Sequence, residues 1–270
     1  MTVAGSVDLS SDVGERPGTS GLAADAELMT TVSSANVACG GHAGDAATMR
    51  ALCDLAVQQH VAVGAQVSYV DRAGFGRRRI NISTNVLVAQ LQQQWGDLAD
   101  AAATAGTRVT YMRPHGALYN AALVDDSIAA AVVAATPPGT PVLCLAGTAL
   151  ARVAAAAGHP VVPEMFADRA VTAQGLLVSR SEPNSVLTDP NAVTTRLSAW
   201  LQTGHLTSHD GHRVRMWAQS ICIHSDTPDA IVSARRIRML VESHGVTVAP
   251  FVTSVPSGSA ELTNHPARPE

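Results

Sequence analysis

Short apolar runs alternate with longer helical patterns along almost the whole sequence, and this alternation restricts the fold more than any other feature. Seven runs are predicted to be buried strands: 7–9, 35–38, 61–65, 109–112, 142–145, 161–166 and 220–223. The longest helical pattern, 83–103, begins at a possible N-cap, Ser83, and Gly106 follows its end. Strict alternation of this kind predicts parallel strands joined by helical crossovers.

Seven strand–helix pairs without a linker-like stretch predict one domain, residues 1–256, folded as a closed seven-stranded parallel (β/α) barrel. An open doubly wound sheet is the alternative. No G-x-G-x-x-G follows the first run, which disfavours a dinucleotide-binding version of that sheet. Residues 180–190 and 205–212 are expected to be polar loops, and residues 257–270 a flexible C-terminal tail.

The composition narrows the classes of function. The formal net charge is −4 without a long basic run, so nucleic acid is not expected as the main partner. All 18 basic residues are arginine, so no lysine amine can act as base or nucleophile. With no signal-like N-terminus and no apolar stretch of about 18 residues, we expect a cytoplasmic protein without a membrane span. Buried free thiols are expected for Cys39, Cys53, Cys144 and Cys222.

Polar residues that suit catalysis gather at the ends of the predicted strands. In a parallel barrel these ends converge on one face, where such enzymes build their active sites. In chain order the candidates are Asp12 and Glu15; Asn36, His42 and Asp45; Gln66, Tyr69 and Asp71; Arg113, His115 and Asn120; Glu164, Asp168 and Arg169; and His224 and Asp226.

Several of these residues also have a purely structural explanation. Asp12 could hydrogen-bond only its own loop, and Asp45 could serve only as the N-cap of the following helix. Glu164 could be the buried ion-pair partner of Arg169. His42 lies among small residues that let a backbone approach a ligand closely, which favours a functional role.

Two further patterns remain open. The turn 74–78 (GFGRR), which contains Arg77, could bind phosphate or carboxylate, or be a plain surface charge run. Histidine and aspartate from different strand ends could hold a hydrolytic metal, but no H-x-x-x-H pair is present, so only the fold could assemble the ligands. His205, His209 and His212 are expected to be exposed to solvent.

Six segments carry a resemblance to a known family: 7–15 (VDLSSDVGE), 33–45 (SSANVACGGHAGD), 74–78 (GFGRR), 113–120 (RPHGALYN), 164–169 (EMFADR) and 221–228 (ICIHSDTP). In these segments, and from about residue 7 to 251, the chain resembles the family of 5-oxoprolinase A-type subunits, also called LamB/YcsF. The resemblance implies a barrel related to the glycoside hydrolase/deacetylase superfamily. It also implies ATP-dependent opening of 5-oxo-L-proline to L-glutamate, with ATP and Mg²⁺ as co-substrate, no tightly bound organic cofactor, and 5-oxoprolinase subunits B and C as partners.

Site roles follow from this resemblance. Arg113 would stabilise charge, His42 or His115 would transfer protons, and Asp12, Asp45 and Asp226 would orient water, metal or histidine. Binding of substrate or nucleotide would involve Glu15, Asn36, Gln66, Tyr69, Arg77, Asn120, Glu164, Asp168, Arg169, His224 and Asp226.

The sequence departs from the family pattern at several positions. Ser11 replaces a cysteine, Gln66 a histidine, Arg113 a lysine and Ser225 a glycine. Gln66 cannot transfer protons and is a poor metal ligand, and Arg113 cannot lose its proton near neutral pH. Two alternatives to the oxoprolinase function therefore stay open: a stand-alone metal-dependent hydrolase of the deacetylase type, and a catalytically silent regulatory subunit.

Overall fold

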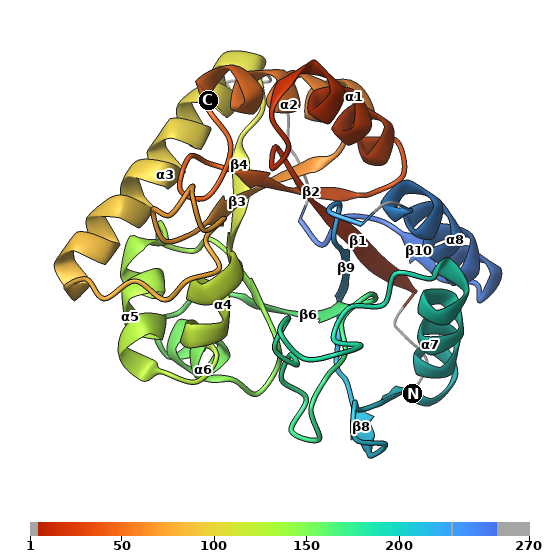
Figure 1. Ribbon diagram of the computed structural model, residues 1–270. Helices are drawn as coiled ribbons and strands as arrows, with labels where there is room; N and C mark the ends of the chain where they lie inside the picture. The colour runs from red at the N-terminus through yellow and green to blue at the C-terminus, as the bar shows by residue number, and fades with distance from the viewer. Residues whose placement is uncertain (1–4, 228, 253–270) are drawn as a thin grey trace, which may run out of the picture.

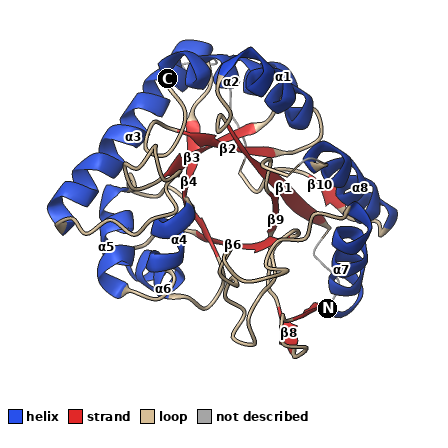
Figure 2. Cartoon of the chain, in the orientation of Figure 1, coloured by secondary structure: helices blue, strands red, loops and turns tan. Residues whose placement is uncertain are grey.

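The computed structural model describes residues 5–227 and 229–252, and its centre is a closed barrel of seven parallel strands (Figures 1 and 2). Strand β1 (Ser6–Val13) pairs with β2 (Ser34–Ala38) on one side and with β9 (Ser220–Ile223) on the other, which closes the ring. The predicted barrel is therefore confirmed and the open doubly wound sheet is wrong. The barrel strands are β1 (Ser6–Val13), β2 (Ser34–Ala38), β3 (Ala62–Val67), β4 (Val109–Pro114), β5 (Val142–Cys144), β6 (Val161–Phe166) and β9 (Ser220–Ile223).

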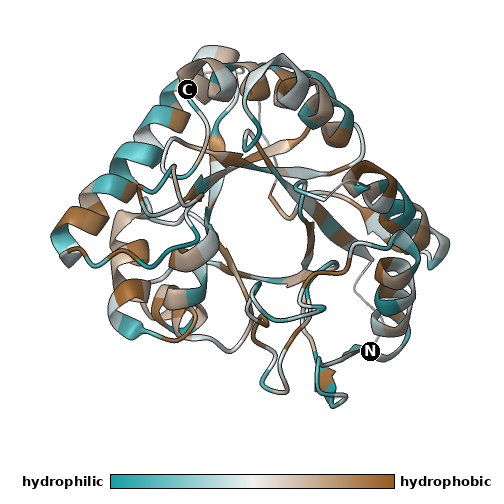
Figure 3. Cartoon of the chain, viewed as in Figure 1, coloured by the Kyte–Doolittle hydropathy of each residue, from teal (hydrophilic) through white to brown (hydrophobic). Residues whose placement is uncertain are grey.

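Helices surround the strands as an outer ring (Figure 2). They are α1 (Gly18–Met29), α2 (Ala46–Gln59), α3 (Thr84–Ala105), α4 (Gly116–Ala122), α5 (Asp126–Ala135), α6 (Ala149–Ala156), α7 (Pro190–Thr203) and α8 (Ala230–Ser243). Hydrophobic and hydrophilic residues alternate along these helices (Figure 3), as expected when one side packs on the barrel and the other faces water. Among the described helices no single one is long and apolar enough to cross a membrane.

Three barrel strands, β1, β3 and β4, extend further toward their carboxyl ends than the apolar runs predict. Asp12 lies inside β1, Gln66 inside β3 and Arg113 inside β4, although the sequence pattern places all three just after their strands. In register, Asp12 is opposite Asn36 and Gln66 is opposite Arg113. The strand ends differ because polar residues usually indicate a loop, whereas here Arg113 bonds to Asp12 and Gln66 bonds to Glu15 inside the barrel.

Some elements are absent from the sequence prediction. Helix α4 begins directly after His115, and a hairpin of β7 (His205–Thr207) and β8 (Arg213–Arg215) replaces part of the expected loop 205–212. A short extended segment at 246–248 is in contrast expected from the sequence, and it forms β10 (Thr247–Val248), which pairs with the start of β1 outside the closed ring. The predicted tail 257–270, the domain limit at 256 and Pro228 lie outside the described residues.

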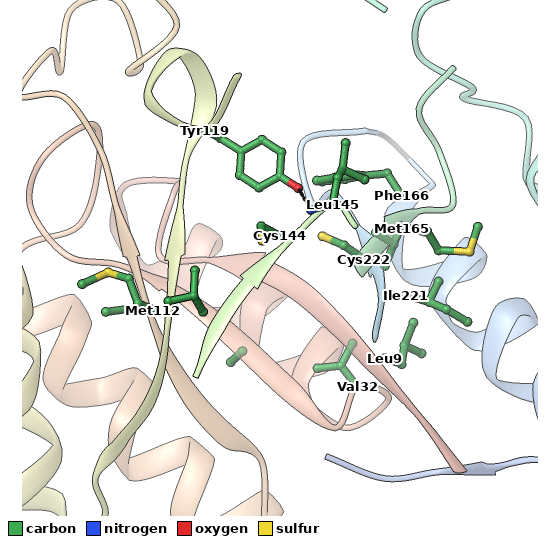
Figure 4. Packing of buried hydrophobic residues seen from close by; sticks show 14 of the residues in the cluster. Leu9, Val32, Met112, Tyr119, Cys144, Leu145, Met165, Phe166, Ile221 and Cys222 are labelled. Carbon is green, nitrogen blue, oxygen red and sulfur yellow. Dashed lines mark hydrogen bonds between the residues drawn. The ribbon is translucent and has the colours of Figure 1, made fainter. Parts of the chain in front are cut away.

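Apolar side chains fill the space between the barrel strands and the helices. Figure 4 shows this packing, with Met165 and Ile221 on neighbouring strands. The Tyr119 hydroxyl accepts a hydrogen bond of 3.1 Å from the Leu145 backbone N–H in the same region. All four cysteines are buried free thiols, as predicted.

Candidate functional site

A buried arginine is hydrogen-bonded to two carboxylates inside the barrel, near the carboxyl ends of its strands. The Arg113 guanidinium donates to Asp12 Oδ1 at 2.7 Å and to Glu164 Oε2 at 3.1 Å, so three strands meet through one side chain. The Tyr119 and Phe166 rings lie 5.7 and 5.3 Å from the guanidinium carbon. The expected Glu164–Arg169 pair is wrong, because Arg169 instead donates to the carbonyls of residues 178 and 185.

Asp12 is held at the end of a polar chain across the barrel. Tyr111 donates to Asn36 Oδ1 at 2.8 Å, and Asn36 Nδ2 donates to Asp12 Oδ1 at 3.0 Å. Gly64 makes room for this chain, since a Cβ there would lie 2.0 Å from the Tyr111 ring. Asp12 Oδ2 is buried without a hydrogen-bond partner among the described residues, so it can accept a hydrogen bond from a bound ligand.

A second buried cluster combines one carboxylate with two stacked imidazoles. Glu15 Oε1 lies 3.1 Å from His42 Nε2 and 3.3 Å from His115 Nδ1. The two rings are 3.7 Å apart and nearly parallel. Gln66 Nε2 donates to Glu15 at 3.0 Å and lies 3.0 Å from His115 Nδ1. One ligand atom from each of Glu15, His42 and His115 lies within 4.8 Å of the others, so these three residues could hold a metal ion.

Burial favours the uncharged forms of this cluster. Desolvation and the nearby Asp12 raise the pKa of Glu15 to about 8. Desolvation lowers the pKa of His42 to about 4 and that of His115 well below its ordinary value. A cluster that is uncharged at neutral pH avoids the cost of an unpaired buried charge.

The glycine-rich turn 74–78 brings the backbone against both imidazoles. Gly76 has φ +63°, and a Cβ there would lie 2.9 Å from His42 Cβ. The Phe75 carbonyl oxygen next to it lies 3.2 Å from His115 Nε2. The glycine therefore allows an approach that a side chain would block.

A histidine–aspartate pair follows the ends of β9 and β6. His224 Nδ1 lies 3.0 Å from Asp168 Oδ1, and the His224 ring stacks on Phe166 with centroids 5.3 Å apart. Burial alone would lower the pKa of His224, but the charge and hydrogen bond of Asp168 outweigh it and raise that pKa. Asp168 thus orients the ring and favours the imidazolium form.

Arginines from two loops meet an aspartate from a third loop at the rim. Arg77 and Arg180 both donate to Asp226 Oδ2, at 2.6 and 3.1 Å. Burial alone would raise the pKa of Asp226, but these two arginines and the charged His224 outweigh it and lower that pKa. Arg180 is missing from the sequence prediction, because one arginine in a polar loop carries no sequence signal.

A cavity of about 550 Å³ connects these groups. It contains residues of the Arg113 network, the imidazole cluster, the His224 pair and the rim, together with apolar side chains. Its polar lining residues include Asp12, Arg77, Arg113, His115, Asn120, Arg169, Ser179, Arg180, Ser181 and His224. Most of the predicted residues are thus brought to one place, as parallel-barrel topology requires.

Some predicted residues lie elsewhere. Asp45 is exposed and accepts a hydrogen bond of 2.8 Å from Thr48 N, so the structure places it as the N-cap of α2. Tyr69 is buried outside the cavity lining, and Asp71 pairs with Arg78 and the Gly74 N–H within the turn. His209 and His212 are exposed as expected, whereas His205 is half-buried in β7.

A closed parallel barrel with acid–base and anion-binding groups at the carboxyl ends of its strands defines this protein as a barrel enzyme. The LamB/YcsF family model matches residues 7–255, and the chain belongs to that family. It is 49% identical to the 5-oxoprolinase A subunit of Streptomyces avermitilis and 47% identical to that of Streptomyces coelicolor. Each alignment covers 91% of this chain and 99% of the relative.

A solved structure agrees with the sequence comparisons. The crystal structure of the lactam utilization protein from Thermus thermophilus superimposes with a TM-score of 0.83 at 36% identity. The match covers 91% of this chain and 100% of that one. A crystal structure of a relative therefore has the same fold as this chain.

Proposed function

We propose that this chain is the A subunit of a 5-oxoprolinase that opens 5-oxo-L-proline to L-glutamate. The observation that carries the proposal is 49% identity to a 5-oxoprolinase A subunit over 99% of that relative's length. ATP with Mg²⁺ would be the co-substrate, and subunits B and C the partners. The presence of a cavity with acid–base groups favours this function over a silent regulatory subunit.

The cavity suits a small anionic lactam. 5-Oxoproline carries one carboxylate beside a five-membered cyclic amide. Arg77 and Arg180 at the rim supply charge for a carboxylate or phosphate, while Leu123 and Leu176 offer apolar surface to the ring. Asp12 Oδ2, which lacks a partner among the described residues, would accept the lactam N–H or orient water.

Two residues would have different roles in the reaction: Arg113 in charge stabilisation and His224 in proton transfer. A lactam is a stable amide. Transfer of the terminal phosphoryl group of ATP to its oxygen, with release of ADP, would make the carbon a better target for water. Attack of water and cleavage of the ring C–N bond would leave an acyl phosphate, which a second water would hydrolyse to the carboxylate and inorganic phosphate. Arg113 lines the cavity and is held in place by Asp12 and Glu164, so it would direct an N–H toward the substrate oxygen as negative charge develops there. His224, oriented by Asp168 and lining the cavity, would give its proton to the leaving ring nitrogen. Proton transfer is thus assigned to His224 in preference to His42 or His115.

The test is glutamate release from 5-oxoproline and ATP by a mixture of this chain with subunits B and C. Omission of this chain should abolish release, and His224→Ala should lower kcat by about 10²–10⁴-fold. His209→Ala, an exposed histidine outside the cavity, is the matched control. Release that is unchanged without the chain would refute the function, and normal turnover by His224→Ala would refute the assigned role.

A further inference from the structure

The imidazole cluster has more hydrogen-bond acceptors than donors at its centre. Glu15 Oε1, His42 Nε2 and His115 Nδ1 face one another, with the nitrogens 3.1 and 3.3 Å from the carboxylate oxygen. Whether His42 Nε2 and His115 Nδ1 carry a hydrogen depends on the hydrogen-bond partner of the other nitrogen in the same ring. Those partners are backbone carbonyls, directly or through one hydroxyl.

The tautomer of His115 follows from its outer partner. Its Nε2 lies 3.2 Å from the carbonyl oxygen of Phe75, which can only accept a hydrogen bond. Nε2 therefore carries the hydrogen. In the neutral ring Nδ1 is then a lone pair, and it points at Glu15.

The tautomer of His42 follows by the same reasoning through Ser68. The Ser68 hydroxyl donates its single hydrogen to the Tyr69 carbonyl at 2.9 Å. It can therefore only accept from His42 Nδ1, which lies 3.0 Å away. Nδ1 carries the hydrogen, and Nε2 presents a lone pair to Glu15 at 3.1 Å.

With the Glu15 carboxyl ionised, three lone-pair atoms thus converge on one point within the part of the chain that is described. Gln66 Nε2 donates to Glu15 and can donate to His115, whereas the partner of His42 Nε2 is the Glu15 carboxyl oxygen Oε1 itself. Histidines that donate one N–H to a carbonyl and point the other nitrogen inward are the usual arrangement around a protein-bound metal.

We propose that Glu15, His42 and His115 bind a divalent transition-metal ion of the Zn²⁺ or Co²⁺ class. Two imidazole nitrogens and one carboxylate suit these ions, whereas Mg²⁺ and Ca²⁺ take oxygen ligands. Gln66 Oε1 is buried without a partner among the described residues, and rotation of this amide would turn it toward the ion as a weak fourth ligand. Binding of this ion would require neither ATP nor the lactam, so the proposal can be tested without activity.

The experiment uses the full chain, freed of metal with a chelator and titrated with Co²⁺ and Zn²⁺. Binding is followed by Co²⁺ absorption and by the metal content after gel filtration. We expect one ion per chain, and Glu15→Gln and His42→Asn should each weaken binding by at least about 10-fold. Gln66→His should tighten it, because an added imidazole replaces a weak amide ligand. His209→Ala is the control for adventitious binding to a surface histidine.

Two results would overturn the proposal. One is wild-type binding no tighter than that of Glu15→Gln, with Gln66→His also unchanged. The other is retention of one tightly bound ion by a His42→Asn/His115→Asn double variant, which would place the ion elsewhere. In either case a proton on Glu15, donated to His42, would account for the cluster. Circular dichroism of each variant confirms folding, and a Zn²⁺-dependent rise in the wild-type Tm gives a second reading that needs no variant.

Discussion

Single residues at this site are fixed by buried charge as much as by hydrogen bonds. Arg113 is the clearest case, since it is the common partner of Asp12 and Glu164 and all three are almost inaccessible to water. A buried ion pair contributes little net stability compared with apolar packing, but removal of one partner leaves an uncompensated charge. The stability of the site therefore requires Arg113 together with both of its carboxylate partners.

Arg113→Met should destabilise the fold because it leaves two buried carboxylates without a cation. The expected loss is about 3–5 kcal/mol in the free energy of unfolding, measured by urea denaturation near neutral pH. Arg113→Lys keeps the positive charge and should lose less. An unfolding midpoint for Arg113→Met equal to that of the wild type would contradict this account.

Asp8 lies at the other end of the barrel interior, and its ionisation should make the free energy of unfolding depend on pH. Desolvation raises its pKa to about 6 despite hydrogen bonds from Ser33, Ser34 and Ser220. The native state therefore holds more protons than the unfolded state between pH 3.8 and about 6, so the contribution of Asp8 to stability falls as pH rises through that window.

Asp8→Asn removes this penalty while nearly keeping the side-chain shape. The variant should be more stable than the wild type above about pH 7, by up to about 3 kcal/mol, and the difference should shrink toward about pH 4. Thermal unfolding of both proteins across this pH range measures it. Equal Tm differences at all pH values would show that Asp8 does not titrate in this way.

At the level of elements, small residues decide how closely strands and turns approach. Gly64 in β3 faces the Tyr111 ring of β4, and Tyr111 in turn holds Asn36 of β2. A side chain in one strand would therefore displace a hydrogen-bond chain that crosses three strands. The packing of elements and the position of Asp12 are coupled through this contact.

Gly64→Ala should disturb both stability and site. The added Cβ would lie 2.0 Å from the Tyr111 ring, and such overpacking costs about 1–3 kcal/mol. Urea unfolding measures the cost. Gly96→Ala in α3 is the control, because no described atom outside its own helix backbone and chain neighbours lies within 4 Å of its Cβ position. The explanation fails if Gly64→Ala is as stable as the control.

At the level of the whole molecule, the rim of the cavity is assembled from separate loops. Arg77 follows β3, Arg180 follows β6 and Asp226 follows β9, yet the two arginines share one carboxylate oxygen. Closure of the barrel is what brings the ends of β3, β6 and β9 around one mouth. The recognition of an anionic substrate that we propose for this rim would consequently depend on the complete ring.

Arg180→Ala should weaken binding of the substrate more than it slows the chemistry. In the three-subunit mixture we expect KM for 5-oxoproline to rise by at least about 10-fold with a smaller change in kcat, since the arginine would contact the carboxylate and not the reacting amide. Arg213→Ala in the β7–β8 hairpin provides a matched surface control. An unchanged KM would remove Arg180 from the substrate site.

The sequence by itself determined the alternation of strands and helices, the Asp45 cap of α2 and the left-handed Gly106 at the end of α3, because these depend on nearby residues. It also indicated that the strand ends would gather polar groups. Only the tertiary structure decided that Arg113 pairs with Glu164, that Asp12 and Gln66 lie within strands, and that Arg180 joins the rim. The Arg180–Asp226 partners are 46 residues apart and the Arg113–Asp12 partners 101, and closure of the barrel, not local pattern, brings them into contact.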